Sequence, residues 1–419
     1  MVLQGILMAE SITRINYKET KVPVVFEEGN FVPIVSLQLV FTNAGHLSNT
    51  KDGLADMSAK LLNEGTKKDG SVGFAEKLDD HAVDVSAHVG RESFVFEVSA
   101  LKSEFPYAIE RLKELLRDPN YTQKALDQVK RQKIGWLTQK KSDFDYVAAT
   151  KLREILFKGT ALARPYDGTI DSVKSMTLQD IETFISSHLG YNNAIAVIGG
   201  DISFDEAEKY VNELLPLLGK VKKEETKHFT VSDKKETVLV PEDTQQAYIY
   251  FGAPFHYSYK EKDQYKAKIA EYILGGAGFG SRLMEEIRVK RGLTYGAYSV
   301  LRRTKYASYL SGYLQTKLST QEEAKTLVQK VVDDFVAKGI TAQELESAKK
   351  FLVGSEPLRT ETLSQRLNRA YNEFYYGRPL GFSKEQLKKI ETVTLEEMNT
   401  FIKAHPELSE LSFAIVTKK

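Results

Sequence analysis

The chain has 419 residues, with 58 Lys and Arg against 57 Asp and Glu, and it contains no cysteine. This length favours two or more domains, each able to bury a core of its own. The near-neutral charge gives no argument for nucleic-acid binding, and no apolar run reaches the ~18 residues of a membrane-spanning helix. Without cysteine, any metal would have to be held by His, Asp or Glu.

Residues 1–9 are mildly apolar, but they lack a basic segment and are short for a signal peptide. We therefore expect a cytoplasmic protein, or a periplasmic one if a signal peptide has been removed.

In the first half, short apolar runs alternate with segments of helical spacing. Strands are expected at 22–26, 34–41, 82–89, 93–101 and 193–201, and helices at 54–62, 74–78, 106–116, 123–141, 145–157 and 204–217. The strands at 82–89 and 93–101 are joined by a short turn that contains glycine, which predicts a β-hairpin.

Residues 219–235 are charged and nearly free of large aliphatic side chains, which predicts a linker. After it the order of elements restarts. Strands are expected at 237–240, 246–251, 293–300, 309–315 and 411–416, and helices at 265–273, 320–338, 342–353, 363–375 and 395–404. The repeated order predicts an α+β protein with two homologous domains, 1–218 and 236–419, each a mainly antiparallel sheet packed with helices.

The most distinctive stretch is 274–300, LGGAGFGSRLMEEIRVKRGLTYGAYSV. Its first glycines, Gly275 and Gly276 among them, permit close backbone approach or positive φ. Ser281 is placed to cap a short helix, and Gly292 to end it in a left-handed conformation.

Arg288 then falls on the last turn of that helix and Tyr295 on the strand that follows, so a guanidinium and a phenol can project from one junction. A phosphate-binding loop is disfavoured, because the Lys-Ser/Thr pair of a P-loop is missing. The remaining alternative is a tight turn with a solvated arginine and a half-buried tyrosine.

Residues 53–66 read GLADMSAKLLNEGT. This segment resembles the zinc-binding helix of the pitrilysin/insulinase peptidases, in which H-x-x-E-H supplies two zinc ligands and a general base. Here Asp56 stands in place of the first histidine, Ala59 in place of the base, and Lys60 in place of the second histidine. The segment keeps the spacing of the motif, but it lacks the two zinc ligands and the general base.

By the same resemblance, a third ligand, a glutamate, belongs on the helix at 123–141. The only acid there is Asp127, near its start, and the ligand position falls at about Trp136. A cation at Lys60 would also repel a metal ion. We therefore expect no zinc in this chain.

The resemblance also covers the second half, where the family has a Gly-rich turn followed by Arg and Tyr seven residues apart. In that family the two side chains donate hydrogen bonds to the backbone of a bound peptide. The match implies this role for Arg288 and Tyr295, with Gly275 and Gly276 in the peptide-binding surface.

The family also pairs extended substrate with an edge strand, here 84–88, which implies peptide contacts at Ser86, Ala87 and His88. His81 and His88 lie seven residues apart on a hairpin, and no acid completes a metal-ligand set with them. We expect both to be ordinary surface histidines.

The resemblance implies half of a peptidase clamshell. The chain would be the zinc-free subunit of a heterodimeric peptidase, inactive alone, whose homologous partner carries H-x-x-E-H and the zinc. Substrates would be extended peptides. The alternative is a catalytically inactive homodimer that binds peptides or acts as a scaffold.

Overall fold

The computed structural model describes residues 11–419. This part of the chain forms two compact units, each built around one β-sheet. The first unit comprises the residues up to Thr138 together with Pro165–Thr226 and Arg359–Leu380; the second comprises Gln139–Arg164, Lys227–Leu358 and Gly381–Lys419.

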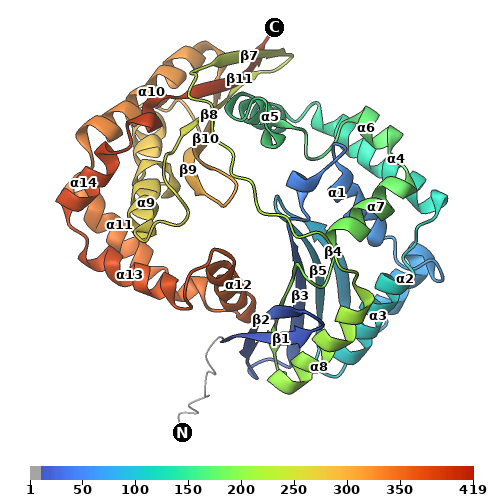
Figure 1. The fold of residues 1–419 in the computed structure, drawn as a ribbon. Helices are drawn as coiled ribbons and strands as arrows, with labels where there is room; N and C mark the ends of the chain where they lie inside the picture. Colours follow the sequence, from blue (N-terminus) through green and yellow to red (C-terminus); the bar gives the residue numbers. More distant parts are fainter. Residues whose placement is uncertain (1–10) are drawn as a thin grey trace. The chain divides into compact units, whose positions relative to one another are not determined.

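The sheet of the first unit has six strands in the order β1-β2-β6-β3-β5-β4 (Figure 1). Its strands are β1 (Ser11–Tyr17), β2 (Thr20–Glu28), β3 (Ile34–Thr42), β4 (Asp84–Val89), β5 (Ser93–Leu101) and β6 (Ala194–Gly200). Strands β2 and β6 are parallel, and the other neighbours are antiparallel.

The sheet of the second unit has five strands in the order β7-β11-β8-β10-β9. Its strands are β7 (Thr237–Glu242), β8 (Gln246–Pro254), β9 (Ala297–Arg303), β10 (Ser308–Lys317) and β11 (Ser412–Lys418). Strands β7 and β11 are parallel, as are β2 and β6, and the rest are antiparallel. Because the order matches β2-β6-β3-β5-β4, the expected pair of homologous, mainly antiparallel α+β domains is confirmed.

Helices cover one face of the first sheet and bury a core of aliphatic and Phe side chains against it. In the first unit the helical segments are η1 (His46–Ser48), α1 (Leu54–Leu62), α2 (Gly70–Asp79), α3 (Phe105–Arg117), α4 (Gln123–Lys140), α6 (Ile170–Ser175), α7 (Leu178–His188), α8 (Phe204–Leu214), η3 (Leu215–Leu217) and α12 (Leu363–Tyr375).

The second sheet has its own core with the helices packed on it. The helical segments of this half are α5 (Phe144–Leu156), η2 (Ala161–Ala163), α9 (Gln264–Glu271), η4 (Tyr272–Gly276), η5 (Met284–Val289), η6 (Leu318–Thr320), α10 (Gln321–Lys338), α11 (Ala342–Gly354), η7 (Pro357–Arg359), α13 (Phe382–Thr392), α14 (Leu395–Lys403) and η8 (Pro406–Ser409). Two of them, η4 and η5, are π-helical.

Each sheet takes one helix from the opposite half of the sequence (Figure 1). Helix α5 lies against β8 and β11, and α12 lies against β2 and β6. The units therefore differ from the uninterrupted halves expected from the sequence. In the first unit the reason is that the sheet has a second apolar face, where valines and isoleucines of the strands pack on Leu367 and Ala370 of α12.

An ion pair in the first unit holds α12 on its sheet. The Arg366 guanidinium donates from Nε to Oε1 of Glu27 over 2.6 Å, and the Glu27 side chain is 1% exposed. Arg366 also donates to the carbonyl oxygens of Thr360 and Glu361. A buried carboxylate needs such a partner, which fixes the helix in one position.

Some elements were not expected from the sequence, namely β1, α6, α7 and α13. The strand expected at 293–300 begins only at Ala297. The linker expected at 219–235 has no helix or strand from 220 to 235, although Val221 and Val231 are buried.

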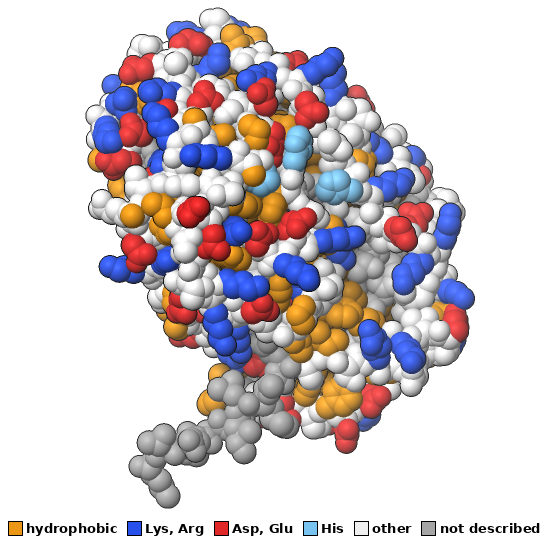
Figure 2. Space-filling view, turned by 60° about the vertical axis from the view of Figure 1, so that its left-hand side comes forward, with side chains coloured by type: hydrophobic (Ala, Val, Ile, Leu, Met, Phe, Trp, Pro, Cys, Tyr) orange, Lys and Arg blue, Asp and Glu red, His pale blue; other side chains and the backbone are white. Residues whose placement is uncertain are grey.

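No helix within residues 11–419 is both long and apolar enough to cross a membrane. On the face drawn in Figure 2, basic and acidic side chains are interspersed, with no broad field of one sign. This agrees with the absence of a nucleic-acid signal in the composition.

Candidate functional site

A chain reversal in the second unit carries Arg288 and Tyr295. The helical segment before it ends in η5, where the N–H of Lys290 donates to the carbonyl of Glu285 in the i→i+5 pattern of a π-helix. Gly292 has φ +63°, and its N–H donates to the carbonyl of Arg288 over 2.9 Å. The left-handed end expected at this glycine is confirmed.

Arg288 packs on an aromatic ring instead of a carboxylate. Its Cζ lies 4.4 Å from the ring centroid of Phe279. The nearby Glu286 forms ion pairs with Lys290 at 2.6 Å and with Arg291 at 2.9 Å. These bonds lower the pKa of Glu286. Within residues 11–419 Arg288 makes no ion pair, so its guanidinium keeps donors for a ligand.

Tyr295 lies in the loop before β9. The sequence had led us to expect it on the strand itself. Thr294 holds the loop, because its Oγ1 donates to the carbonyl of Gly296 over 2.8 Å and accepts from the Gly296 N–H over 3.1 Å. Thr316 Oγ1 donates to the Leu293 carbonyl over 2.6 Å. The Tyr295 side chain is 88% exposed, so the alternative of a half-buried strand tyrosine is wrong.

The glycines before the helix have different structural roles. Gly278 and Gly280 have φ of +59° and +102°, which other residues rarely adopt. Gly275 is buried, and a Cβ there would overlap Ser299 of β9. Gly276 is exposed. Of the two glycines assigned to the peptide-binding surface, only Gly276 is therefore open to a ligand.

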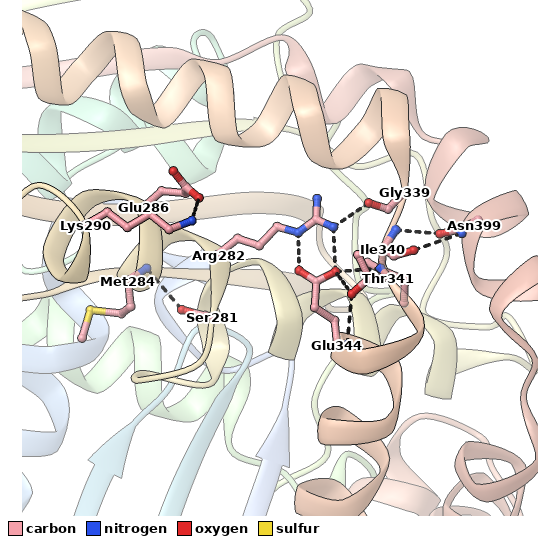
Figure 3. A network of polar contacts seen from close by, with 10 residues as sticks. All are labelled: Ser281, Arg282, Met284, Glu286, Lys290, Gly339, Ile340, Thr341, Glu344 and Asn399. Carbon is pink, nitrogen blue, oxygen red and sulfur yellow. Dashed lines mark hydrogen bonds and ion pairs between the residues drawn. The ribbon is translucent and has the colours of Figure 1, made fainter.

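The start of the helix is anchored by Arg282 (Figure 3). Arg282 donates from Nε and Nη2 to the two carboxylate oxygens of Glu344, over 2.6 and 2.8 Å, and from Nη2 to the carbonyl of Gly339 over 2.7 Å. Glu344 also accepts from the N–H of Thr341 at the start of α11. A bidentate, charge-assisted contact of this kind fixes the orientation of a helix. The network thereby positions the segment that bears Arg288.

A groove of about 860 Å³ lies beside this network, between the same helix, α10 and α11. Four basic and four acidic side chains line it, so it has no charge preference. Neither Arg288 nor Tyr295 belongs to its lining. The groove therefore does not replace Arg288 and Tyr295 as the candidate site.

In the first unit, the positions that match the zinc motif hold an ion-pair cluster. Lys133 of α4 places Nζ 2.9 Å from Oδ2 of Asp56 and 3.5 Å from Oδ1 of Asp167, and its side chain is 3% exposed. Lys60 lies 3.8 Å from the other oxygen of Asp56. An ammonium group is thus the cation at this site.

These residues do not fit zinc. Asp56 is already bound to cations, Ala59 offers no base, and Lys60 repels a metal ion. The ring of Trp136 packs against Lys133 Nζ at 4.1 Å and supplies no ligand. No group of three or more His, Asp or Glu elsewhere in the described chain could hold a metal.

The role of Lys133 was not recognised from the sequence. The available signal was a lysine one helical turn before Trp136, close to the position where the family has its third ligand. Such a lysine is also common on a solvated helix face, so its burial could only be seen in the structure.

His46 lies near this cluster, although the sequence assigned it no role. Burial lowers its pKa to about 4; Arg91 and Lys133 act in the same direction, while Asp56 and Asp167 oppose them. Its Nδ1 is buried and has no hydrogen-bond partner in the described chain. His46 is therefore neutral at pH 7.

Strand β4, which carries Ser86, Ala87 and His88, is an edge strand as expected. Its outward-facing backbone is occupied at one position by Asn63, at the end of α1. The Ala87 N–H donates to Asn63 Oδ1 over 2.8 Å, and Asn63 Nδ2 donates to the Ala87 carbonyl over 2.9 Å. The carboxamide thus makes the two bonds that an added peptide strand would make.

The histidines of this region are surface residues, as expected. His81 stacks on Tyr107 with ring centroids 3.7 Å apart, and its Nδ1 lies 2.7 Å from Glu104. His88 is half exposed and lies 3.9 Å from Glu97.

Two family models match the chain. Residues 24–170 match the model described as insulinase (peptidase family M16), and residues 175–352 match the model described as peptidase M16 inactive domain. The two matches follow one another along the chain, and the second begins within the first half, before β6.

Relatives and solved structures agree with these matches. A protein of Helicobacter pylori named non-peptidase homolog YmxG is 45% identical over 99% of this chain and 96% of the relative. An uncharacterized zinc protease of Streptomyces coelicolor is 22% identical over 81% of this chain and 75% of the relative. The crystal structure of a peptidase M16 inactive domain from Pseudomonas fluorescens has a TM-score of 0.88 and 21% identity over 98% of both chains.

Proposed function

Because this chain belongs to the insulinase family, peptidase family M16, we propose that it is the zinc-free subunit of a two-subunit metallopeptidase. A homologous partner with an intact H-x-x-E-H helix would supply the zinc. This chain would supply Arg288 and Tyr295, and extended peptides would be cleaved at the composite site.

The observation that carries the proposal is the contrast between the residues that match the zinc motif in the first unit and the Arg288–Tyr295 loop in the second. The metal position is closed by the Lys133 ammonium, whereas the Arg288–Tyr295 loop is kept in order with an exposed phenol. A phenol can donate to the oxyanion of a tetrahedral intermediate, and a guanidinium can bind peptide carbonyl oxygens. Three hydrogen bonds of Thr294 and Thr316 order the loop around Tyr295, and the tyrosine itself is 88% exposed, which supports a role in contacting a ligand.

The test is co-expression with each H-x-x-E-H homologue from the same organism, followed by co-purification and cleavage of unstructured peptides. We expect one homologue to co-purify and the pair to cleave peptides, while this chain alone does not. A matched control uses the pair with Glu of the partner's H-x-x-E-H changed to Gln. Co-purification with no homologue, or equal cleavage by the homologue alone, would refute the proposal.

A second candidate is a homodimer that binds peptides or serves as a scaffold without cleaving them. The name of the 45% identical relative, a non-peptidase homolog, favours it. It predicts a dimer of this chain by light scattering and peptide binding without cleavage, whichever homologue is added.

A further inference from the structure

Three tyrosines form a row across the second sheet. Tyr313 of β10 lies directly opposite Tyr250 of β8 and Tyr298 of β9, so all three side chains point to the same face. The ring centroids of each neighbouring pair are 5.5 Å apart, with interplanar angles of 19° and 34°. We call these three residues the tyrosine row.

The row is held in place at both ends. The Tyr250 hydroxyl donates to Oδ1 of Asp145 on α5 over 3.0 Å, and Gln315 donates to Oδ2 of the same carboxylate over 2.7 Å. Burial, followed by the Asp145 charge, raises the pKa of Tyr250, so its phenol remains a donor. At the other end Gly296 leaves room for Tyr298, because a Cβ there would come within 2.6 Å of its ring.

Part of the same face is open. Helix α5 covers β8 and β11, whereas Tyr313 on β10 is 40% exposed and Val300 on β9 is 38% exposed. Tyr295, in the loop that leads into β9, is also exposed. The open face therefore continues along the chain into the loop proposed to bind the peptide backbone.

The exposed charges that β9 and β10 place on this face are basic, whereas the Asp145 carboxylate of α5 beside the row already accepts hydrogen bonds from Tyr250 and Gln315. Arg302 lies opposite Tyr309, and Lys317 lies on the same face at the end of β10; both are exposed. Neither β9 nor β10 contains an Asp or a Glu. The open part of the face, on β9 and β10, is thus complementary to an acidic ligand.

The edge of β9 is not the place where a ligand binds. The N–H of Ala297 contacts Sδ of Met284 at 3.2 Å, and Gly275 packs against Ser299. These outward-facing positions are covered by the chain's own helical segments. A ligand would therefore lie on the face of the sheet, across the rings.

We infer that the tyrosine row and its basic margin form a binding surface for an extended peptide segment in which an aromatic side chain is flanked by acidic ones. The inference rests on the proposed peptide function and names its substrate class. Aligned, already ordered rings offer stacking surface at little entropic cost, and their hydroxyl groups can bond to the peptide backbone.

The test measures binding of three dye-labelled peptides to the full chain by fluorescence anisotropy. One peptide has a central Phe between Glu residues, the second has Ala for Phe, and the third has Lys for Glu. We expect the first peptide to bind about tenfold more tightly than either of the others. A tenfold difference in Kd corresponds to roughly the binding free energy of one stacked ring or one charge contact.

The variants locate the site. Tyr313→Ala is expected to weaken binding of the first peptide about tenfold. Tyr313→Phe keeps the ring, so its affinity for the same peptide should stay close to that of the wild type. Phe31→Ala is the matched control, because Phe31 is 71% exposed and lies in the other unit. The Arg302→Ala/Lys317→Ala pair should remove the preference for Glu over Lys, and it provides a second probe if Tyr313→Ala does not fold.

Equal binding of the three peptides, or unchanged binding by Tyr313→Ala and by the Arg302/Lys317 variant, would overturn the inference. Cleavage of the same peptides by the assembled pair would then leave the proposed function standing. If neither the chain nor any pair binds or cleaves a peptide, both fail.

Discussion

Lys133 on α4 and Asp56 on α1 form a buried ion pair, with Nζ 2.9 Å from Oδ2 and a lysine side chain that is 3% exposed. Asp56 occupies the position of the first histidine in the zinc motif of the family. The carboxylate that replaces this ligand is therefore neutralised by a cation from the chain itself. The pairing joins α1 to α4, as a shared metal ion would.

Lys133→Met should destabilise the first unit by about 3 kcal/mol, because it leaves Asp56 and Asp167 without their buried cation. Lys124→Met is the matched control on the same helix, where the lysine is exposed, and it should change the free energy of unfolding by no more than about 0.5 kcal/mol. Chemical denaturation measures both. Equal stability of the two variants would contradict the role given to the ion pair.

The same ion pair bears on metal content. The wild-type chain, purified without chelator, should contain no stoichiometric zinc by elemental analysis. A variant with Asp56→His, Ala59→Glu, Lys60→His and Trp136→Glu should take up less zinc than the same variant with Lys133→Met, because the ammonium repels a second cation. One zinc per wild-type chain would contradict this prediction.

Tyr295→Phe should lower kcat of the assembled pair about 10²–10³-fold, because one oxyanion donor is lost while the ring remains. This corresponds to a loss of roughly 3–4 kcal/mol of transition-state stabilisation. Arg288→Ala should also raise KM, since a guanidinium on a peptide carbonyl acts in the ground state too. Both variants should melt near the wild-type temperature, because Tyr295 is 88% exposed and Arg288 makes no ion pair in the described chain. Unchanged kcat in Tyr295→Phe would remove the catalytic assignment.

Asn63→Leu should expose the outward edge of β4 at Ala87, because both of its backbone bonds to the carboxamide are lost. We expect a loss of about 1–2 kcal/mol and faster hydrogen exchange of the Ala87 amide. Asn63→Asp keeps the acceptor and loses only the donor, so the amide should stay partly protected. Identical exchange in all three proteins would show that the edge is protected in some other way.

His46 should make the protein less stable in acid. Its pKa is about 4 in the folded chain, below the ordinary value of 6.5, so the unfolded chain takes up the proton first as the pH falls. The contribution is complete above about pH 6.5 and is lost between pH 6.5 and 4, at a cost of roughly 3 kcal/mol. His46→Phe removes this titration, and its unfolding free energy should fall less steeply over that range. If the unfolding free energy of the two proteins fell equally steeply with pH, His46 would not be the cause of the loss of stability in acid.

Limited tryptic digestion should cut first within 222–227, which has no helix or strand and consists almost entirely of exposed, charged residues. Later parts of the linker are better protected, because the Phe229 and Ser232 amides donate to carbonyl oxygens and Val231 is buried. A first cut inside a helix or strand of either unit would show that the linker is not the weakest segment.

Local patterns in the sequence were enough for the features that depend on neighbouring residues. Hydrophobic spacing predicted most strands and helices and their repetition in the two halves, because each element shows its buried face in its own sequence. The loss of the zinc motif at Asp56, Ala59 and Lys60 was likewise evident, since those residues lie within one helix. The turn at Gly292 followed from the conformational freedom of glycine.

The tertiary structure decided what depends on residues far apart in the chain. Lys133 meets Asp56 and Asp167 only after α4 packs on α1, and Arg366 reaches Glu27 across 339 positions. Side chains such as these look like solvated charges in the sequence, because nothing local reveals their burial. The exchange of α5 and α12 between the units and the alignment of the tyrosine row follow from packing and strand register, which only the folded chain determines.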